Sequence, residues 1–288
     1  MSYVKILAPL TGGSRDAIVL ASAFAAAKPF NAHVVALFVR PDPAEAMPFY
    51  GEGVSGAMAQ EIVDAAKEAA DKATEGARAT LAAVAREAGA AITDKPEKRD
   101  GLSASYREVQ GNFADRVAQA SQLSDLVMFG PLKEGDRPGL AEAFEAALLE
   151  TGRPVILTGQ AASKNFARRI AIGWDGSGAC GRALLAAMPY LARAESIELL
   201  TIRKPNTTCE SCDEAAEYLR MHGLASTERQ IDAGSRPVGA VLLEAAADGG
   251  AGLLVLGGYG HSRLLQMFAG GVTKHVVAHA EMPLFLVH

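Results

Sequence analysis

The sequence predicts an α/β protein with two tandem open parallel sheets of five strands each, both doubly wound. Short apolar runs alternate with helical segments along the whole chain, and this alternation calls for parallel strands covered by helices on both faces. The order of segments also repeats: residues 124–130 resemble residues 251–257, and residues 153–157 resemble residues 282–286. We therefore expect two similar domains packed against each other as an internal pseudo-dimer.

The first predicted domain covers residues 1–159. Its strands are short, branched, apolar runs between turn residues, and its helices show apolar spacing or are rich in Ala, Glu and Lys. Ser14 is the expected N-cap of the first helix, and the Pro- and Gly-rich residues 41–56 are an expected loop. The expected strands are 4–10, 34–39, 105–109, 126–129 and 154–157, and the expected helices are 18–28, 58–87, 113–120 and 139–150.

The second predicted domain covers residues 168–288 and follows a small, polar linker at about residues 159–168. The same criteria identify its elements, and its last helix is expected to begin near Gly271, where Val272, Val276 and Ala280 form an apolar row. The expected strands are 169–174, 197–202, 227–231, 253–256 and 284–287, and the other expected helices are 177–191, 213–222 and 238–247.

Composition narrows the functional classes. The formal charge is −5, so non-specific electrostatic binding of nucleic acid is not expected. No apolar run reaches the roughly 18–20 residues that span a bilayer, and no basic amphipathic helix indicates a membrane surface. The start of the chain enters a strand without a signal peptide, and three cysteines are too few for a disulfide framework. These observations favour a cytoplasmic protein.

The most informative stretch joins the strand at residues 253–256 to the last helix. Gly257, Gly260 and Gly270 stand in it at G-x2-G-x9-G spacing, which is neither a P-loop nor the GxGxxG dinucleotide motif. A strand, a glycine-rich loop and a helix N-terminus together form a plausible phosphate site, because glycine permits close approach and the helix start offers unpaired N–H groups. Such a connection also occurs in α/β proteins without any ligand.

With these residues in place, the chain resembles the universal stress protein family in its tandem two-domain form. The resemblance rests on the glycine spacing, on residues 174–177 (Trp-Asp-Gly-Ser) after the first strand of the second half, and on the closing strand at residues 282–287. It implies an adenine-nucleotide α-hydrolase-like fold. In nucleotide-binding members of this family, ATP lies at the carboxyl ends of the strands, as expected for a doubly wound sheet.

The resemblance also implies roles for individual residues. Asp175 matches an acidic residue that meets the adenine, and Gly257 and Gly260 match the loop that lets ribose and phosphates lie against the backbone. His261 and Ser262 follow within reach of phosphate oxygens.

The same resemblance places phosphates at the start of the last helix. The residues concerned there are Gly270, Gly271, Val272 and Thr273. Gly271 stands where the family often has Ser or Thr, so that Thr273 or backbone N–H groups alone would hold the phosphates. The implied ligand is ATP, ADP or AMP, with or without Mg²⁺.

The first half departs from this pattern. Thr11 stands at the position of Asp175, and Pro131 follows Gly130 where a second glycine is absent. Proline lacks a backbone donor, and the nearby acids Glu134 and Asp136 would repel phosphates. We expect no nucleotide in the first half.

Other interpretations of single residues stay open. Asp175 also fits ordinary turn chemistry, and Trp174 fits packing better than ligand stacking. His275 and His279 stand at i, i+4, which suits a metal, but without an HExxH frame a metal is disfavoured. Cys209 and Cys212 form a CxxC that is either a redox pair or, as we favour, two ordinary thiols.

Three functions remain. The favoured one is an ATP-binding, non-catalytic regulator or protector in the stress response. The second is a slow ATP hydrolase or adenylyl-transferring enzyme, and the third is a nucleotide-free interaction protein. A homodimer or another protein partner stays open for all three.

Overall fold

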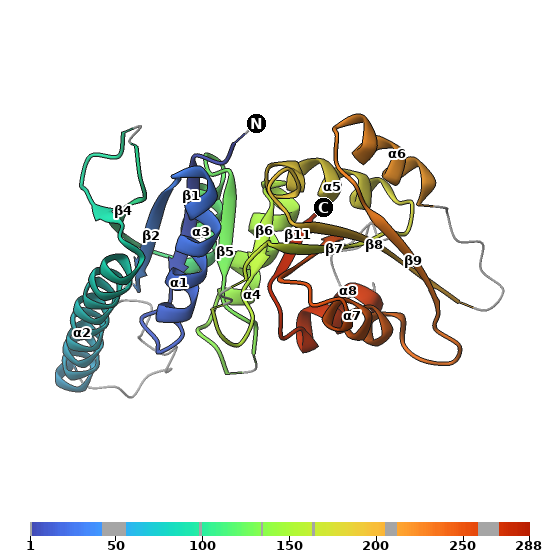
Figure 1. Ribbon diagram of the computed structural model, residues 1–288. Coiled ribbons are helices and arrows are strands. Elements are labelled where there is room, and N and C mark those ends of the chain that lie inside the picture. Colours follow the sequence, from blue (N-terminus) through green and yellow to red (C-terminus); the bar gives the residue numbers. More distant parts are fainter. Residues whose placement is uncertain are drawn as a thin grey trace.

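A single mixed sheet runs through the whole molecule (Figure 1). The computed structural model describes residues 2–41, 56–97, 100–133, 135–162, 165–204, 212–258 and 271–288. In these residues the sheet has eleven strands in the order β3-β4-β2-β1-β5-β6-β11-β10-β7-β8-β9. The strands of the two halves run in clearly different directions in Figure 1, so the sheet twists strongly.

The elements fall close to the predicted ranges. The first half contains β1 (Lys5–Leu10), α1 (Asp16–Ala27), η1 (Lys28–Phe30), β2 (His33–Arg40), α2 (Gly56–Ala88), β3 (Ala91–Ile92), β4 (Ser103–Gln110), α3 (Phe113–Ser121), β5 (Leu126–Phe129), α4 (Leu140–Glu145), η3 (Ala146–Glu150) and β6 (Val155–Leu157). The second half contains β7 (Arg169–Gly173), α5 (Gly178–Leu191), β8 (Ser196–Arg203), α6 (Asp213–Met221), β9 (Thr227–Asp232), α7 (Val238–Asp248), β10 (Leu253–Gly257), α8 (Gly271–His279) and β11 (Leu284–Val287).

Three local predictions differ in detail from the structure. The described residues of the first half form six strands rather than five, because Ala91–Ile92 pairs with Ser103 and Ala104 at the sheet edge. The helix expected at 139–150 ends as a π-helical turn, η3. The N-cap of α1 is Arg15 rather than Ser14, and the Arg15 side chain makes no capping hydrogen bond. The expected loop at 41–56 lies mostly outside the described residues.

The two halves share one strand order and join through their last strands. Apart from β3, the strands of each half have the same order from the outer edge of the sheet to the junction. In chain order, they are the third, second, first, fourth and fifth strand of that half. β6 and β11 pair antiparallel with Ile156 opposite Phe285, whereas the pairs within each half are parallel. The pseudo-dimer predicted from the repeat is therefore a continuous sheet, and the internal edges are paired with each other.

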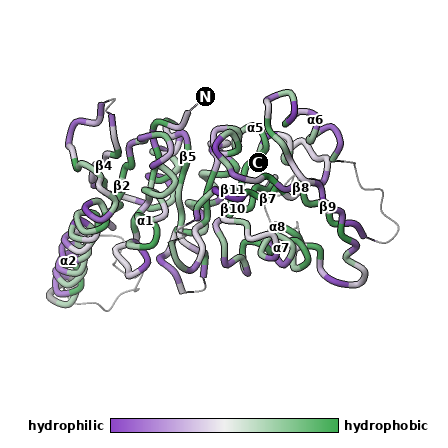
Figure 2. The backbone as a smooth tube through the Cα atoms, in the orientation of Figure 1, coloured by the Kyte–Doolittle hydropathy of each residue, from purple (hydrophilic) through white to green (hydrophobic). Residues whose placement is uncertain are grey.

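Helices cover both faces, and each face has its own core. One core joins α1, α2, α5 and α6 to the sheet, and the other joins α3, α4, η3, α7 and α8. Apolar colouring is concentrated in the strands, and polar residues are frequent on α2 and α6 (Figure 2). Both cores contain residues from the two halves, so neither face is interrupted at the junction.

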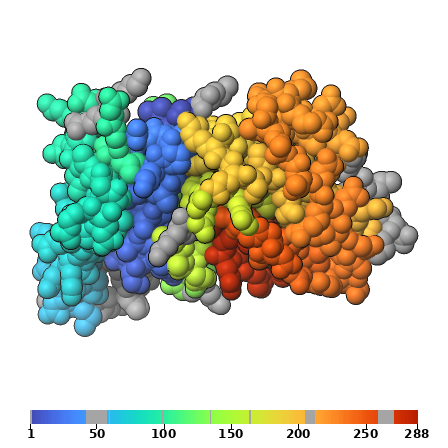
Figure 3. All heavy atoms as spheres, viewed as in Figure 1, coloured from blue at the N-terminus to red at the C-terminus, as the bar shows by residue number. Residues whose placement is uncertain are grey.

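The junction contains a cluster of aromatic rings around Tyr190 of α5. Its side chain is fully buried, and its hydroxyl donates to the Ala26 carbonyl of α1 at 3.0 Å. The Tyr3 hydroxyl likewise donates to the Ala186 carbonyl of α5. The space-filling view shows α1 (blue) and α5 (yellow) in contact (Figure 3). These contacts hold the relative position of the halves.

Candidate functional site

In the second half, β7 and β10 end side by side at one edge of the sheet. β10 lies beside β7, with Leu256 opposite Gly173, and the connections from these two strands lead to opposite faces of the sheet. This arrangement is the topological switch point at which doubly wound sheets hold ligands. Asp175 follows β7 and Gly257 is the last residue of β10, so the structure brings these two predicted residues to the same edge of the sheet.

Asp175 lies exposed directly beyond β7. Its Oδ1 accepts a hydrogen bond from the Ser177 backbone N–H at 2.8 Å. Ser177 in turn caps α5, since its hydroxyl accepts from Cys180 N–H at 3.2 Å. The turn role of Asp175 is thus present, and its exposed carboxylate stands at the strand end.

Gly257 allows the start of α5 to pack against the end of β10. A Cβ atom added to Gly257 would lie 2.4 Å from the Cys180 backbone nitrogen and 2.5 Å from the Ala179 carbonyl carbon. No side chain fits at such distances, so this glycine is required by helix packing. The sequence motif therefore carries a structural requirement in addition to the ligand contact that the family resemblance implies.

None of the described residues fills the space beside the first residue of α8. A Cβ atom on Gly271 would meet no described residue within 4 Å, and Gly271 itself is exposed. Val272 is partly buried against the second core, and Thr273 is 9% exposed. Unpaired N–H groups of a first helical turn suit an anion. The other predicted residues, Gly260, His261, Ser262 and Gly270, lie outside the described residues.

The last helix, α8, also carries His275 and His279. The rings of His275 and His279 stack with centroids 4.2 Å apart, and His279 Nδ1 lies 2.8 Å from the His275 carbonyl oxygen. Within the described ranges, no group of three or more His, Cys, Asp or Glu side chains has metal-site geometry.

The described cysteines are buried thiols. Burial, and then the nearby Asp175 carboxylate, raise the pKa of Cys180 to about 11. Burial and a hydrogen bond with Glu228 raise the pKa of Cys212 to about 11 as well. A redox-active CxxC would need a lowered thiol pKa, so Cys212 does not support that interpretation. Its partner in the motif, Cys209, is not among the described residues.

We expect Cys180 to resist alkylation in the native protein. A thiol pKa near 11 leaves roughly 100-fold less thiolate at pH 8 than an ordinary value of about 9. Because the native state holds this proton more tightly, its stabilising effect is present below about pH 9 and is lost as the pH rises through 11. Timed iodoacetamide labelling with peptide mapping measures the rate, with guanidinium-unfolded protein as the control. Equal native and unfolded labelling rates would contradict the assignment.

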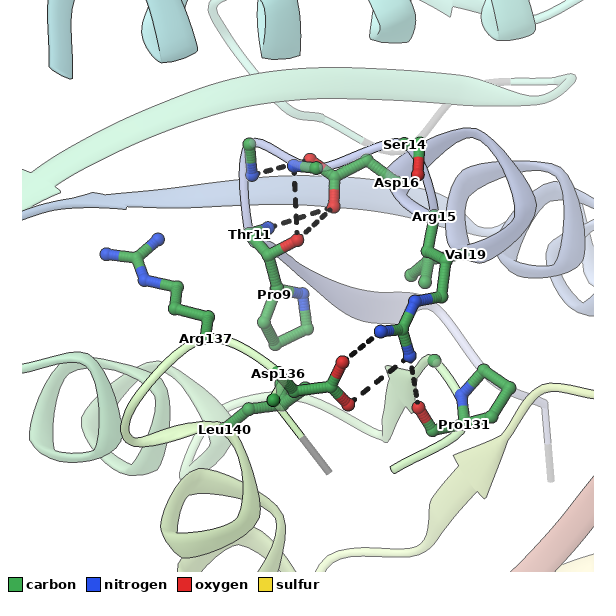
Figure 4. A pocket seen from close by; sticks show the side chains of 14 residues that line it. Pro9, Thr11, Ser14, Arg15, Asp16, Val19, Pro131, Asp136, Arg137 and Leu140 are labelled. Atoms are coloured by element: carbon green, nitrogen blue, oxygen red, sulfur yellow. Dashed lines mark hydrogen bonds and ion pairs between the residues drawn. The ribbon is translucent and has the colours of Figure 1, made fainter. Parts of the chain in front are cut away.

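The matching crevice of the first half is crossed by its own side chains (Figure 4). It has a volume of about 270 Å³ between the ends of β1 and β5. Arg15 reaches across it, forms an ion pair with Asp136 and donates to the Pro131 carbonyl at 2.9 Å. This bridge joins the loop after β1 to the loop after β5.

The Asp16 carboxylate accepts hydrogen bonds from two backbone N–H groups at the end of β1. It accepts from the N–H groups of Thr11 and Gly12 at 2.9 and 2.8 Å, and from the Thr11 hydroxyl at 3.0 Å. Burial raises the pKa of Asp16, while these hydrogen bonds and the charge of Arg137 oppose the shift. The N–H groups of Thr11 and Gly12 thus already have an acceptor within the chain.

Sequence reasoning missed Arg15, Asp16 and Arg137. Arg137 is partly buried, with its guanidinium 4.5 Å from the Phe113 ring centroid and its Nη2 bonded to the Val39 carbonyl at 2.5 Å. Arg15 and Asp136 are far apart in the sequence, so no local sequence pattern indicated that they form an ion pair. Asp16, placed in the first turn of a helix after a Thr-Gly-Gly turn, was the one available signal.

The fold and the strand-end site define a tandem, doubly wound α/β protein. Residues 167–288 match the model of the Universal stress protein family. This second half is therefore a universal stress protein domain, and the first half has a similar fold. No match was found among the curated protein sequences.

Solved structures agree with the fold over nearly the whole chain. A universal stress protein from Archaeoglobus fulgidus is 15% identical, with 98% of this chain and 95% of that chain covered and a TM-score of 0.65. A functionally unknown protein from Pseudomonas aeruginosa is 10% identical, with 99% and 92% covered and a TM-score of 0.55. These likenesses extend across both halves and confirm the predicted tandem architecture. None of the described helices has the length and apolar character to cross a bilayer.

Proposed function

We propose that residues 168–288 form a domain that binds ATP or a related adenine nucleotide, with or without Mg²⁺. Residues 1–159 form a second domain that binds none and serves as the packing partner. The protein then acts as a nucleotide-responsive, non-catalytic regulator or protector in the stress response.

The observation that carries this proposal is the contrast between the two strand-end positions. In the second half, no described residue lies within 4 Å of a Cβ atom on Gly271 at the start of α8, and Asp175 is exposed beyond β7, the neighbour of β10. In the first half, Asp16 takes the backbone donors and Arg15 bridges the crevice. The family match to residues 167–288 supports the same assignment.

The described residues offer hydrogen-bond partners that suit an adenine nucleotide. Asp175 would accept from the adenine amino group, and the N–H groups of Gly271, Val272 and Thr273 would hold phosphate oxygens at the positive end of α8. The predicted contacts of Gly260, His261, Ser262 and Gly270 belong to the same proposal. Backbone donors rather than a lysine would hold most of the ligand's charge.

Isothermal titration with ATP tests the asymmetry. Asp175→Ala should weaken binding by roughly 5- to 30-fold, because one hydrogen bond to the base is lost. Thr11→Ala, the matched change in the first half, should leave the affinity unchanged. Asp175→Asn keeps an acceptor for Ser177 N–H, so it separates loss of the turn from loss of the charge. Equal losses at positions 175 and 11 would overturn the proposal.

A further inference from the structure

A groove in the first half, away from both strand-end crevices, is both apolar and cationic. It lies between α3 and the strands β4, β2 and β1, and its volume is about 600 Å³, within the usual range of ligand sites. Its lining residues are Lys5, Leu37, Arg107, Val109, Gln110, Arg116, Gln119, Ala120, Gln122 and Leu123.

Three cations line this groove, and none of its described lining residues is acidic. Arg107 is exposed and forms no ion pair within the described ranges. Within the described part of the chain, the hydrogen-bond partners of Arg116 are neutral: its Nε donates to the Gln110 carbonyl at 2.9 Å and its Nη1 to Gln119 Oε1 at 3.3 Å. The positive charge of Arg116 is therefore positioned without being neutralised by these contacts.

Lys5 adds a partly buried charge close to Arg107. Burial lowers the pKa of Lys5, the charge of Arg107 lowers it further, and Asp125 opposes both effects. The Asp125 carboxylate is directed to the backbone, since its Oδ2 accepts from Val4 and Lys5 N–H at 2.7 and 2.9 Å. A bound anion would relieve the repulsion between Lys5 and Arg107.

The strand alternation explains why these cations face an open surface. Tyr106 and Glu108 of β4 face α2, where Arg78 lies over the Tyr106 ring at 4.3 Å and pairs with Glu108 at 3.3 Å. Arg107 and Val109 therefore face the α3 side, and Leu37 is the neighbour of Arg107 on β2. β3 pairs only with Ser103 and Ala104, so it leaves this part of β4 at the edge of the described sheet.

The apolar side chains of the groove indicate that its ligand has an apolar body. Leu37 and Ala120 are buried and Val109 is partly buried, while Leu123 at one end is 83% exposed. We propose that this groove binds a small organic anion with an apolar body, whose carboxylate, sulfonate or phosphate group lies among Lys5, Arg107 and Arg116. The site is independent of the proposed nucleotide site.

A pair of fluorescent probes tests this proposal on the full chain with saturating ATP. Anilinonaphthalene sulfonate has an apolar body and one negative charge, and phenylnaphthylamine has the same body without the charge. The double variant Arg107→Gln/Arg116→Gln should bind the sulfonate at least about tenfold more weakly, because two charge-assisted contacts are lost. Its affinity for the uncharged probe should not change.

Two further variants locate the site. Arg86→Gln removes one exposed charge from α2 outside the groove and should leave binding of the sulfonate unchanged. Gln119→Trp should fill the groove and abolish the binding of both probes. The proposal is overturned if the double variant binds the sulfonate as wild type does, if Arg86→Gln weakens it equally, or if Gln119→Trp leaves both probes bound.

Discussion

Replacing Tyr190 by alanine is expected to lower the free energy of unfolding by about 3–5 kcal/mol. The side chain is 1% exposed and packs among rings of both halves. Its centroid distances are 5.2 Å to Tyr3, 5.1 Å to Phe30, 5.6 Å to Phe166 and 6.3 Å to Phe285. The variant leaves a cavity at the junction and removes the donor for the Ala26 carbonyl. Urea unfolding followed by circular dichroism measures the loss.

Two companion variants separate the causes. Leu185→Ala lies on the same helix but is 53% exposed, so it should change stability by less than about 1 kcal/mol. Tyr190→Phe keeps the ring and leaves the Ala26 carbonyl without its donor, which should cost about 1–3 kcal/mol. A Tyr190→Ala protein as stable as Leu185→Ala would show that the aromatic cluster does not hold the halves together.

Gly257→Ala is expected to destabilise the protein by about 1–3 kcal/mol and to weaken ATP binding. The new methyl group would lie 2.4 Å from Cys180 N and 2.5 Å from the Ala179 carbonyl carbon. Both contacts are to backbone, so relief requires α5 to move away from β10. This movement would also displace the turn that carries Asp175. Thermal unfolding with and without ATP measures both effects.

Gly271→Ala is the matched control for this glycine. It adds the same methyl group at the start of α8, where no described residue lies within 4 Å. Alanine in place of helical glycine should leave stability unchanged or raise it by up to about 1 kcal/mol. If the two alanine variants were equally stable, close packing of α5 would not explain the glycine at position 257.

The arrangement of elements could be predicted because each strand is a compact apolar run followed by a clear turn. Residues 126–129 and 253–256 are examples, and both form the expected buried strands, β5 and β10. The repeat predicted that the halves pack as a pseudo-dimer, but not that the antiparallel pair β6–β11 joins their two sheets into one. The two-residue strand β3 could not be predicted, because its exposed Ala91 and Ile92 gain strand geometry only from their partners on β4.

The contacts at the strand ends of the two halves could be predicted only in part. The sequence identified Asp136 as an obstacle to phosphate, yet its pairing with Arg15 depends on the approach of two distant loops. Gly257 was predicted from its motif for ligand approach, and its contact with α5 became visible only when helix and strand were placed together. The roles of Asp175 and of the residues at the start of α8 in nucleotide binding remain predictions.

Native mass spectrometry of the intact chain with ATP tests the central claim most directly. The account predicts one adenine nucleotide per chain, retained in Thr11→Ala and reduced in Asp175→Ala at the same ATP concentration. Two nucleotides per chain, none at all, or a single nucleotide lost only when the first half is altered would contradict it.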